Sequence, residues 1–147
     1  MRFFPVLTVY LVLALADVLV VAGVFYQTNT WDLVWIWHVT LYILASVFTY
    51  LLYMIYRSKW VLVSTFTYFY FQVEDILYMI LSTLLGLEPK PWLDPLYRWI
   101  WLDHTLSGYI SRILGFEGAT TLGVSMTALL GLLVMYISVK KAVYTTI

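Results

Sequence analysis

The sequence predicts an all-α, polytopic integral membrane protein. We expect a bundle of four transmembrane helices, with an amphipathic interfacial helix between the third and the fourth. Hydrophobic residues make up 63% of the 147-residue chain and charged residues 11%, whereas ordinary globular domains carry about 25% charged residues. The mean hydropathy is +0.90. In addition, four stretches stay apolar over the about 20 residues that a helix needs to cross a bilayer.

The first expected span covers residues 3–26, in which Asp17 is the only charged residue. Pro5 suits the first turn of a helix, where a missing N–H is not needed. A secretory signal would show the same features, namely Arg2, the apolar run and the small-x-small triplet Ala14-Leu15-Ala16. Because the apolar run resumes directly after Asp17, we expect a retained span.

Three further spans follow at intervals along the chain. The second is expected over residues 31–56, after a short polar link, and the third over residues 59–86, after the basic turn at 57–59. The fourth is expected over residues 119–139, where Lys140 and Lys141 end it. We expect residues 1–147 to form a single membrane domain.

The connection between the third and fourth spans begins with a proline-rich stretch that cannot be helical throughout. Residues 96–114 then show a helical period with two different sides, which predicts a helix lying in the membrane interface. A fifth crossing is the alternative. The expected apolar side holds Leu96, Trp99, Leu102, Leu106, Ile110 and Ile113, and the polar side holds His104, Ser107, Ser111 and Arg112.

Charge placement predicts the orientation of the chain. With four crossings, the basic residues near position 2, at 57–59 and at 140–141 all lie on one side of the membrane. Cytoplasmic loops carry an excess of Lys and Arg. We therefore predict that both termini are cytoplasmic.

Asp17, His38, Glu74 and Asp75 are expected to share one layer of the membrane, about 10–18 Å below its outer face at 1.5 Å rise per residue. A charged residue at the centre of a span costs roughly 2.5–3.5 kcal/mol on insertion scales, and such residues usually face the bundle interior. We predict that these four residues form an acid–base site. Structural roles are the alternative: an interhelical hydrogen bond for Asp17 and a satisfied interior histidine for His38.

Other residues on the same helix faces are predicted to wall a ligand pocket. The alternative is that these aromatic side chains simply pack in the core. The set consists of Trp35, Tyr42, Tyr10, Tyr68, Tyr70, Gln72 and Tyr78.

The fourth span carries small residues at every fourth position, namely Ala119, Gly123, Thr127 and Gly131. Such a face lets a second helix approach closely. It predicts either packing within the chain or contact with a partner, which would be a second copy or another membrane subunit.

Composition and motifs narrow the available chemistry. The chain has no Cys and no basic run, which excludes thiol chemistry and leaves nucleic-acid binding without electrostatic support. No phosphate loop, dinucleotide fingerprint or His-Glu-x-x-His motif is present. We expect no cofactor; a metal held by His38 and carboxylates is the lesser alternative.

Acid–base work on an apolar substrate fits the predicted site. Two neighbouring buried acids cannot both ionise easily, so one can donate a proton to an alkene while aromatic faces stabilise the cation formed. Residues 72–78, QVEDILY, resemble the acidic-pair-plus-aromatic segment of the small membrane lycopene cyclases. The likeness covers only this segment, lacks the proline usual before the acids and assigns no family.

The sequence is compatible with three functions. The first is binding or transformation of an apolar lipid or isoprenoid within the bilayer. The second is the role of a small accessory subunit in a larger membrane complex, and the third is a proton or ion pathway. The sequence leaves open whether the chain is an enzyme.

Overall fold

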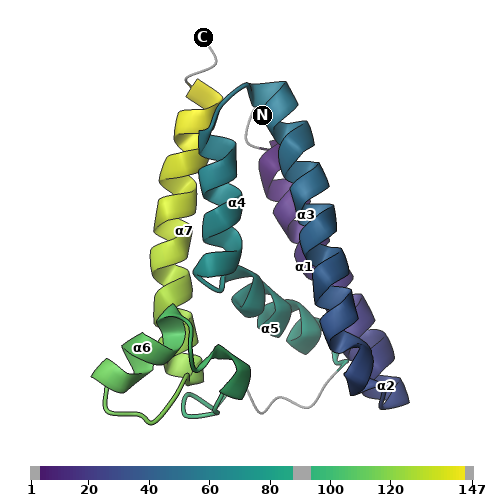
Figure 1. The fold of residues 1–147 in the computed structure, drawn as a ribbon, viewed down its shortest axis with the longest axis vertical. Coiled ribbons are helices and arrows are strands. Elements are labelled where there is room, and N and C mark those ends of the chain that lie inside the picture. Colours follow the sequence, from purple (N-terminus) through teal and green to yellow (C-terminus); the bar gives the residue numbers. More distant parts are fainter. Residues whose placement is uncertain (1–3, 88–93, 145–147) are drawn as a thin grey trace.

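The computed structural model describes residues 4–87 and 94–144, most of which are helical (Figure 1). Three helical stretches are long and apolar enough to cross a membrane: Phe4–Thr28, Trp31–Tyr56 and Thr121–Tyr144. The prediction of a helical protein is confirmed, and so is the presence of helices long and apolar enough to cross a membrane. The first helix begins and the last helix ends at the same end of the molecule (Figure 1).

The first two stretches form an antiparallel pair. Helix α1 (Phe4–Val20) continues through a π-helical turn, η1 (Val21–Phe25), into the short α2 (Tyr26–Thr28). The expected start of this span at residue 3 lies outside the described residues. A 3-10 turn, η2 (Trp31–Leu33), then leads into α3 (Val34–Tyr56).

Both helices of this pair stop at a residue in the left-handed conformation. Asn29 follows α2 with a φ of 55°, and Arg57 follows α3 with a φ of 50°. This conformation reverses the chain direction and closes the last helical turn, since the Arg57 N–H bonds to the Tyr53 carbonyl at 2.7 Å. Chain reversal at 57–59 is thus built into the backbone.

The expectation of one continuous helix over residues 59–86 is wrong. The chain forms α4 (Trp60–Tyr70) and α5 (Val73–Leu85), and Gln72 between them has a φ of 52°. In Figure 1, α5 leaves the axis of α4 beside α7 and runs toward the lower ends of α1 and α3. Accordingly α4 packs mainly on α7, whereas α5 packs mainly on α1.

The break is enclosed by protein and held by side-chain hydrogen bonds. Gln72 is only 4% exposed. Its Oε1 accepts a hydrogen bond from Ser107 Oγ at 2.5 Å, and its Nε2 donates one to the Tyr70 carbonyl at 2.7 Å. A left-handed non-glycine residue costs roughly 1–2 kcal/mol, so these bonds and the surrounding packing offset that cost.

The prediction of one helix over residues 96–114 is also wrong, because the helical part of this segment is shorter. The structure has a 3-10 turn, η4 (Ile100–Leu102), and a short helix, α6 (Leu106–Ile113). Residues 95–99 instead run alongside the start of the last helix. There the Trp99 N–H donates to the Ala119 carbonyl at 2.8 Å and the Thr121 N–H donates to the Tyr97 carbonyl at 3.0 Å.

Helix α6 turns its small polar residues toward the rest of the protein. It buries Ser107, Gly108 and Ser111 against α7, whereas Ile113 is 85% exposed. The serines turn inward because each has a buried partner: Ser107 bonds to Gln72, and Ser111 Oγ accepts the Thr120 N–H at 3.0 Å. Hydrogen bonding therefore decides which face of α6 is buried.

The last helix, α7 (Thr121–Tyr144), has its small residues in contact with other parts of the chain. A Cβ atom on Gly123 would collide with Ser111 Oγ, and one on Gly131 would lie 2.5 Å from Phe71 Cβ and 2.7 Å from Val73 Cγ2. The predicted small-residue face is thus occupied by α6 and by the break between α4 and α5.

We predict that Gly131→Ala destabilises the protein by about 1–3 kcal/mol, because an added methyl group in a packed core forces its neighbours to move. The measurement is thermal unfolding of the purified protein in detergent, followed by circular dichroism. Gly23→Ala is the matched control, since a Cβ atom there has nothing within 4 Å. Equal unfolding midpoints for the two variants would contradict the packing described here.

Candidate functional site

Three helices bring the predicted acid–base residues together. Asp17 comes from α1, His38 from α3, and Glu74 and Asp75 from the first turn of α5. The Asp17 carboxyl accepts a hydrogen bond from Trp37 Nε1 at 2.7 Å, and His38 Nε2 lies 3.9 Å from the same Oδ1 atom. The carboxyl group of Asp17 therefore joins α1 to α3.

Glu74 is buried, as Asp17 is, and it belongs to the same acid cluster. Its side chain lies within hydrogen-bonding reach of the Asp17 carboxyl group, and the residue is 8% exposed. Its Oε1 atom has no hydrogen-bond partner among the described residues. Two carboxyl groups this close can share a proton, but they cannot both be ionised without a large electrostatic penalty.

The break at Gln72 decides where the α5 acids lie. Because α5 begins at Val73, Glu74 and Asp75 occupy its first turn. Backbone N–H groups there lack helical partners, and the positive end of the helix dipole favours carboxylates by about 0.3–1 kcal/mol each. In a continuous helix over residues 59–86 the same acids would lie mid-helix without this stabilisation.

A cavity of about 1320 Å³ opens between α3 and α4 and reaches the acid cluster. Such a volume exceeds the usual 300–1000 Å³ range of small-molecule sites. Aromatic side chains dominate its walls, and polar groups gather near the start of α5. The lining residues used below are Trp35, His38, Tyr42, Tyr70, Gln72, Glu74, Asp75 and Trp101.

A second cavity, of about 630 Å³, lies on the other side of the cluster and is lined by Asp17, Tyr78 and Trp99 among others. The two cavities share four lining residues: Trp35, His38, Asp75 and Trp101. These four side chains form the boundary between the cavities. The acid cluster therefore borders both cavities.

The residues predicted to wall a ligand pocket fall into two groups. Trp35, Tyr42, Tyr70 and Gln72 line the large cavity, and Tyr78 lines the smaller one together with Trp35. Their binding roles stay predictions.

Tyr10 and Tyr68 line neither cavity. Both are buried in the core between α1 and α4, where their rings stack with centroids 4.8 Å apart. The Tyr68 hydroxyl donates to the Tyr10 carbonyl at 3.0 Å, and the Tyr10 hydroxyl lies 2.5 Å from Ser64 Oγ. In this arrangement the two tyrosines join α1 to α4.

Sequence reasoning missed two residues of the site. The indole N–H of Trp37 donates a hydrogen bond to Asp17. Nothing in the sequence distinguishes Trp37 from the other tryptophans of α3. Trp101 borders both cavities from the outer segment, for which the sequence predicts only a helix in the membrane interface. Only the pairing of residues 95–99 with the start of α7 brings Trp101 to this position.

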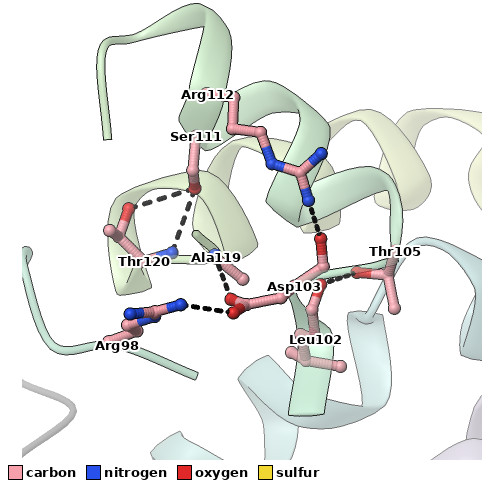
Figure 2. Close-up of polar contacts among 8 residues, drawn as sticks. All are labelled: Arg98, Leu102, Asp103, Thr105, Ser111, Arg112, Ala119 and Thr120. Carbon is pink, nitrogen blue, oxygen red and sulfur yellow. Dashed lines mark hydrogen bonds and ion pairs between the residues drawn. The ribbon is translucent and has the colours of Figure 1, made fainter. Parts of the chain in front are cut away.

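Asp103 fixes the outer segment (Figure 2). Its Oδ2 accepts a hydrogen bond from Arg98 Nη2 at 2.7 Å, its Oδ1 accepts the Ala119 N–H at 2.8 Å, and its carbonyl accepts a bond from Arg112. The hydrogen bond from Arg98, followed by that from Ala119, lowers the pKa of Asp103 below its ordinary value. Asp103 therefore joins η4, α6 and the approach to α7.

Within residues 4–87 and 94–144, no group of three or more His, Asp or Glu side chains is arranged to hold a metal ion. Comparison with known proteins adds no functional information. No protein-family model matches the chain, and neither a curated protein nor a solved structure matches it.

We predict that acid weakens the outer segment through Asp103. A carboxyl group whose pKa is lowered by folding stabilises the protein above its ordinary pKa of about 3.9, and this stabilisation is lost as the pH falls through the lowered value. Asp103→Asn should reduce the unfolding midpoint at neutral pH and flatten its decline between about pH 5 and pH 2. Asp32→Asn, at an exposed aspartate of η2, is the control; an equally flattened profile there would contradict the assignment.

Proposed function

We propose that the chain crosses the membrane four times, with both termini in the cytoplasm, and that it binds an apolar lipid or isoprenoid in the cavity between α3 and α4. The broken pair α4 and α5 would supply the third crossing. One observation carries the functional proposal: an aromatic cavity large enough for a long apolar chain is lined by the buried Glu74 and by the partly exposed Asp75 and His38.

The cluster suits proton exchange with an alkene. A protonated carboxyl group of Glu74 or Asp75 donates its proton to one alkene carbon, which leaves a carbocation and a carboxylate. A carboxylate of the cluster then removes a proton from a neighbouring carbon, so an isomeric alkene forms and the proton count is restored. Asp17 and His38 stand close enough to return the proton to its starting position.

The aromatic walls favour this chemistry over hydrolysis. Trp35, Tyr42 and Tyr70 present ring surfaces along the cavity, and such surfaces attract a positive charge by about 0.5–2 kcal/mol each. Apolar walls also restrict the water that would capture a carbocation.

A proton pathway is the second candidate, because the cluster lies at the boundary between two cavities. Titratable groups placed in series between two openings can pass a proton from one side to the other. Protein-containing vesicles that dissipate a pH gradient, and that stop doing so in Glu74→Gln, would favour this function over lipid chemistry.

We predict that the purified protein retains an apolar lipid, and that incubation in D₂O places deuterium on that lipid. Glu74→Gln and Asp75→Asn should slow deuterium incorporation by roughly 10²–10⁴-fold, the usual contribution of a general acid or base. Mass spectrometry of the organic extract measures both the amount of lipid and its deuterium content.

Glu117→Gln is the matched control, because Glu117 is exposed and lines neither cavity. It should behave as the wild type in both measurements. Unchanged deuterium incorporation in both Glu74→Gln and Asp75→Asn would refute the catalytic role. Absence of any retained lipid in wild-type preparations would sink the binding role.

A further inference from the structure

The residues that line the two cavities carry more acidic than basic side chains. The described residues that line them include Asp17, Asp32, Glu74 and Asp75, but no Lys or Arg. Arg112 on the outer segment already has partners: it lies over the ring of Tyr109, which lines the large cavity, and it donates to the Asp103 carbonyl. The basic side chains in the lining are two histidines, His38 and His104, and His38 already lies 3.9 Å from the Asp17 carboxyl group. An anionic headgroup would therefore meet carboxyl groups without a lysine or arginine to pair with.

One carboxyl oxygen of Glu74 is buried without a hydrogen-bond partner among the described residues. Glu74 is more than nine-tenths buried and lines the large cavity, yet its Oε1 atom has no hydrogen-bond partner among the described residues. A buried polar atom without a partner is costly in free energy. Protonation of Glu74, or a positive charge near its carboxyl group, would reduce the cost of burying a carboxylate here, whereas a negative charge would increase it.

Tryptophan side chains line the same cavity as Glu74. Trp35 and Trp101 border both cavities, and they are 67% and 65% exposed, so their rings are open to a ligand. Trp is the best of the aromatic side chains at attracting a cation. Carboxyl groups and open indole rings thus meet at the boundary between the cavities, and both favour positive charge.

We propose that the site selects an apolar chain with a positive charge at the end that reaches Glu74 and Asp75, and rejects chains that end in phosphate or carboxylate. The charge is either carried by an amine headgroup or formed by protonation of a neutral isoprenoid. This inference rests on the proposed lipid site and specifies its ligand class.

The test uses brominated alkyl chains of one length that end in trimethylammonium, hydroxyl or phosphate. Each is added to the full-length protein in nanodiscs of neutral lipid, and bromine quenching of tryptophan fluorescence is followed against its mole fraction. Protein-free nanodiscs correct for the different partitioning of the three chains. Trp35→Phe identifies the part of the quenching that comes from the cavity.

The trimethylammonium chain should quench at a roughly tenfold lower mole fraction than the alcohol, a preference typical of cation–π and carboxylate contacts together. The phosphate chain should quench least. Asp75→Asn and Glu74→Gln should lose this preference but still bind the alcohol, whereas Glu117→Gln should keep it.

Three results would overturn the inference. Equal quenching by all three chains, or strongest quenching by phosphate, with a clear loss in Trp35→Phe, would refute charge selection while the lipid site stands. Quenching that Trp35→Phe does not change for any chain would refute both. Mass spectrometry of the lipid retained by the wild type separates an amine-headed lipid from a neutral isoprenoid; a phosphate-headed lipid in the cavity would refute charge selection.

Discussion

The left-handed turn at Gln72 is the constraint on which the rest of the structure depends. It ends α4, redirects the chain and starts α5 so that the next acids fall in a first helical turn. The hydrogen bond from Ser107 Oγ to Gln72 Oε1 holds this turn from outside and fixes α6 against the break at the same time. One buried polar contact thus links the acid cluster, the outer segment and the α4–α7 pair.

The close packing of α7 makes that arrangement possible. Gly131 leaves room for Phe71 and Val73 at the break, and Gly123 leaves room for α6. With α4 and α6 held on one side, α5 can lean away toward α1, where Glu74 meets Asp17. The open angle between α3 and α4 is then lined by aromatic side chains rather than filled by a helix.

The electrostatics of the site follow from this geometry. Asp17 receives the Trp37 N–H and faces His38 and Glu74, while Glu74 and Asp75 have the positive end of α5 beside them. Because no Lys or Arg lines either cavity among the described residues, the site is suited to protons and cations. The meeting of aromatic walls and carboxyl groups is the basis of our proposal that the cavity takes an apolar molecule with a positive charge.

The sequence by itself determined the helical, membrane-spanning character of the chain, because hydropathy and helix length depend on local composition alone. It also singled out Asp17, His38, Glu74 and Asp75, since ionisable residues in apolar stretches are costly and must find partners. Only the tertiary structure decided the rest. Nothing local predicts that Gln72 adopts a left-handed conformation, because its partner Ser107 lies 35 residues away.

The same reason explains the other differences. Ser107 and Ser111 turn inward because their hydrogen-bond partners come from other segments, and a helical period cannot reveal such partners. Tyr10 and Tyr68 share faces with pocket residues but stack in the core, while Trp101 reaches the cavities through the pairing of its segment with the start of α7. The sequence shows which residues are polar or aromatic. The folded chain decides which of them come into contact, because the partners lie far apart in the sequence.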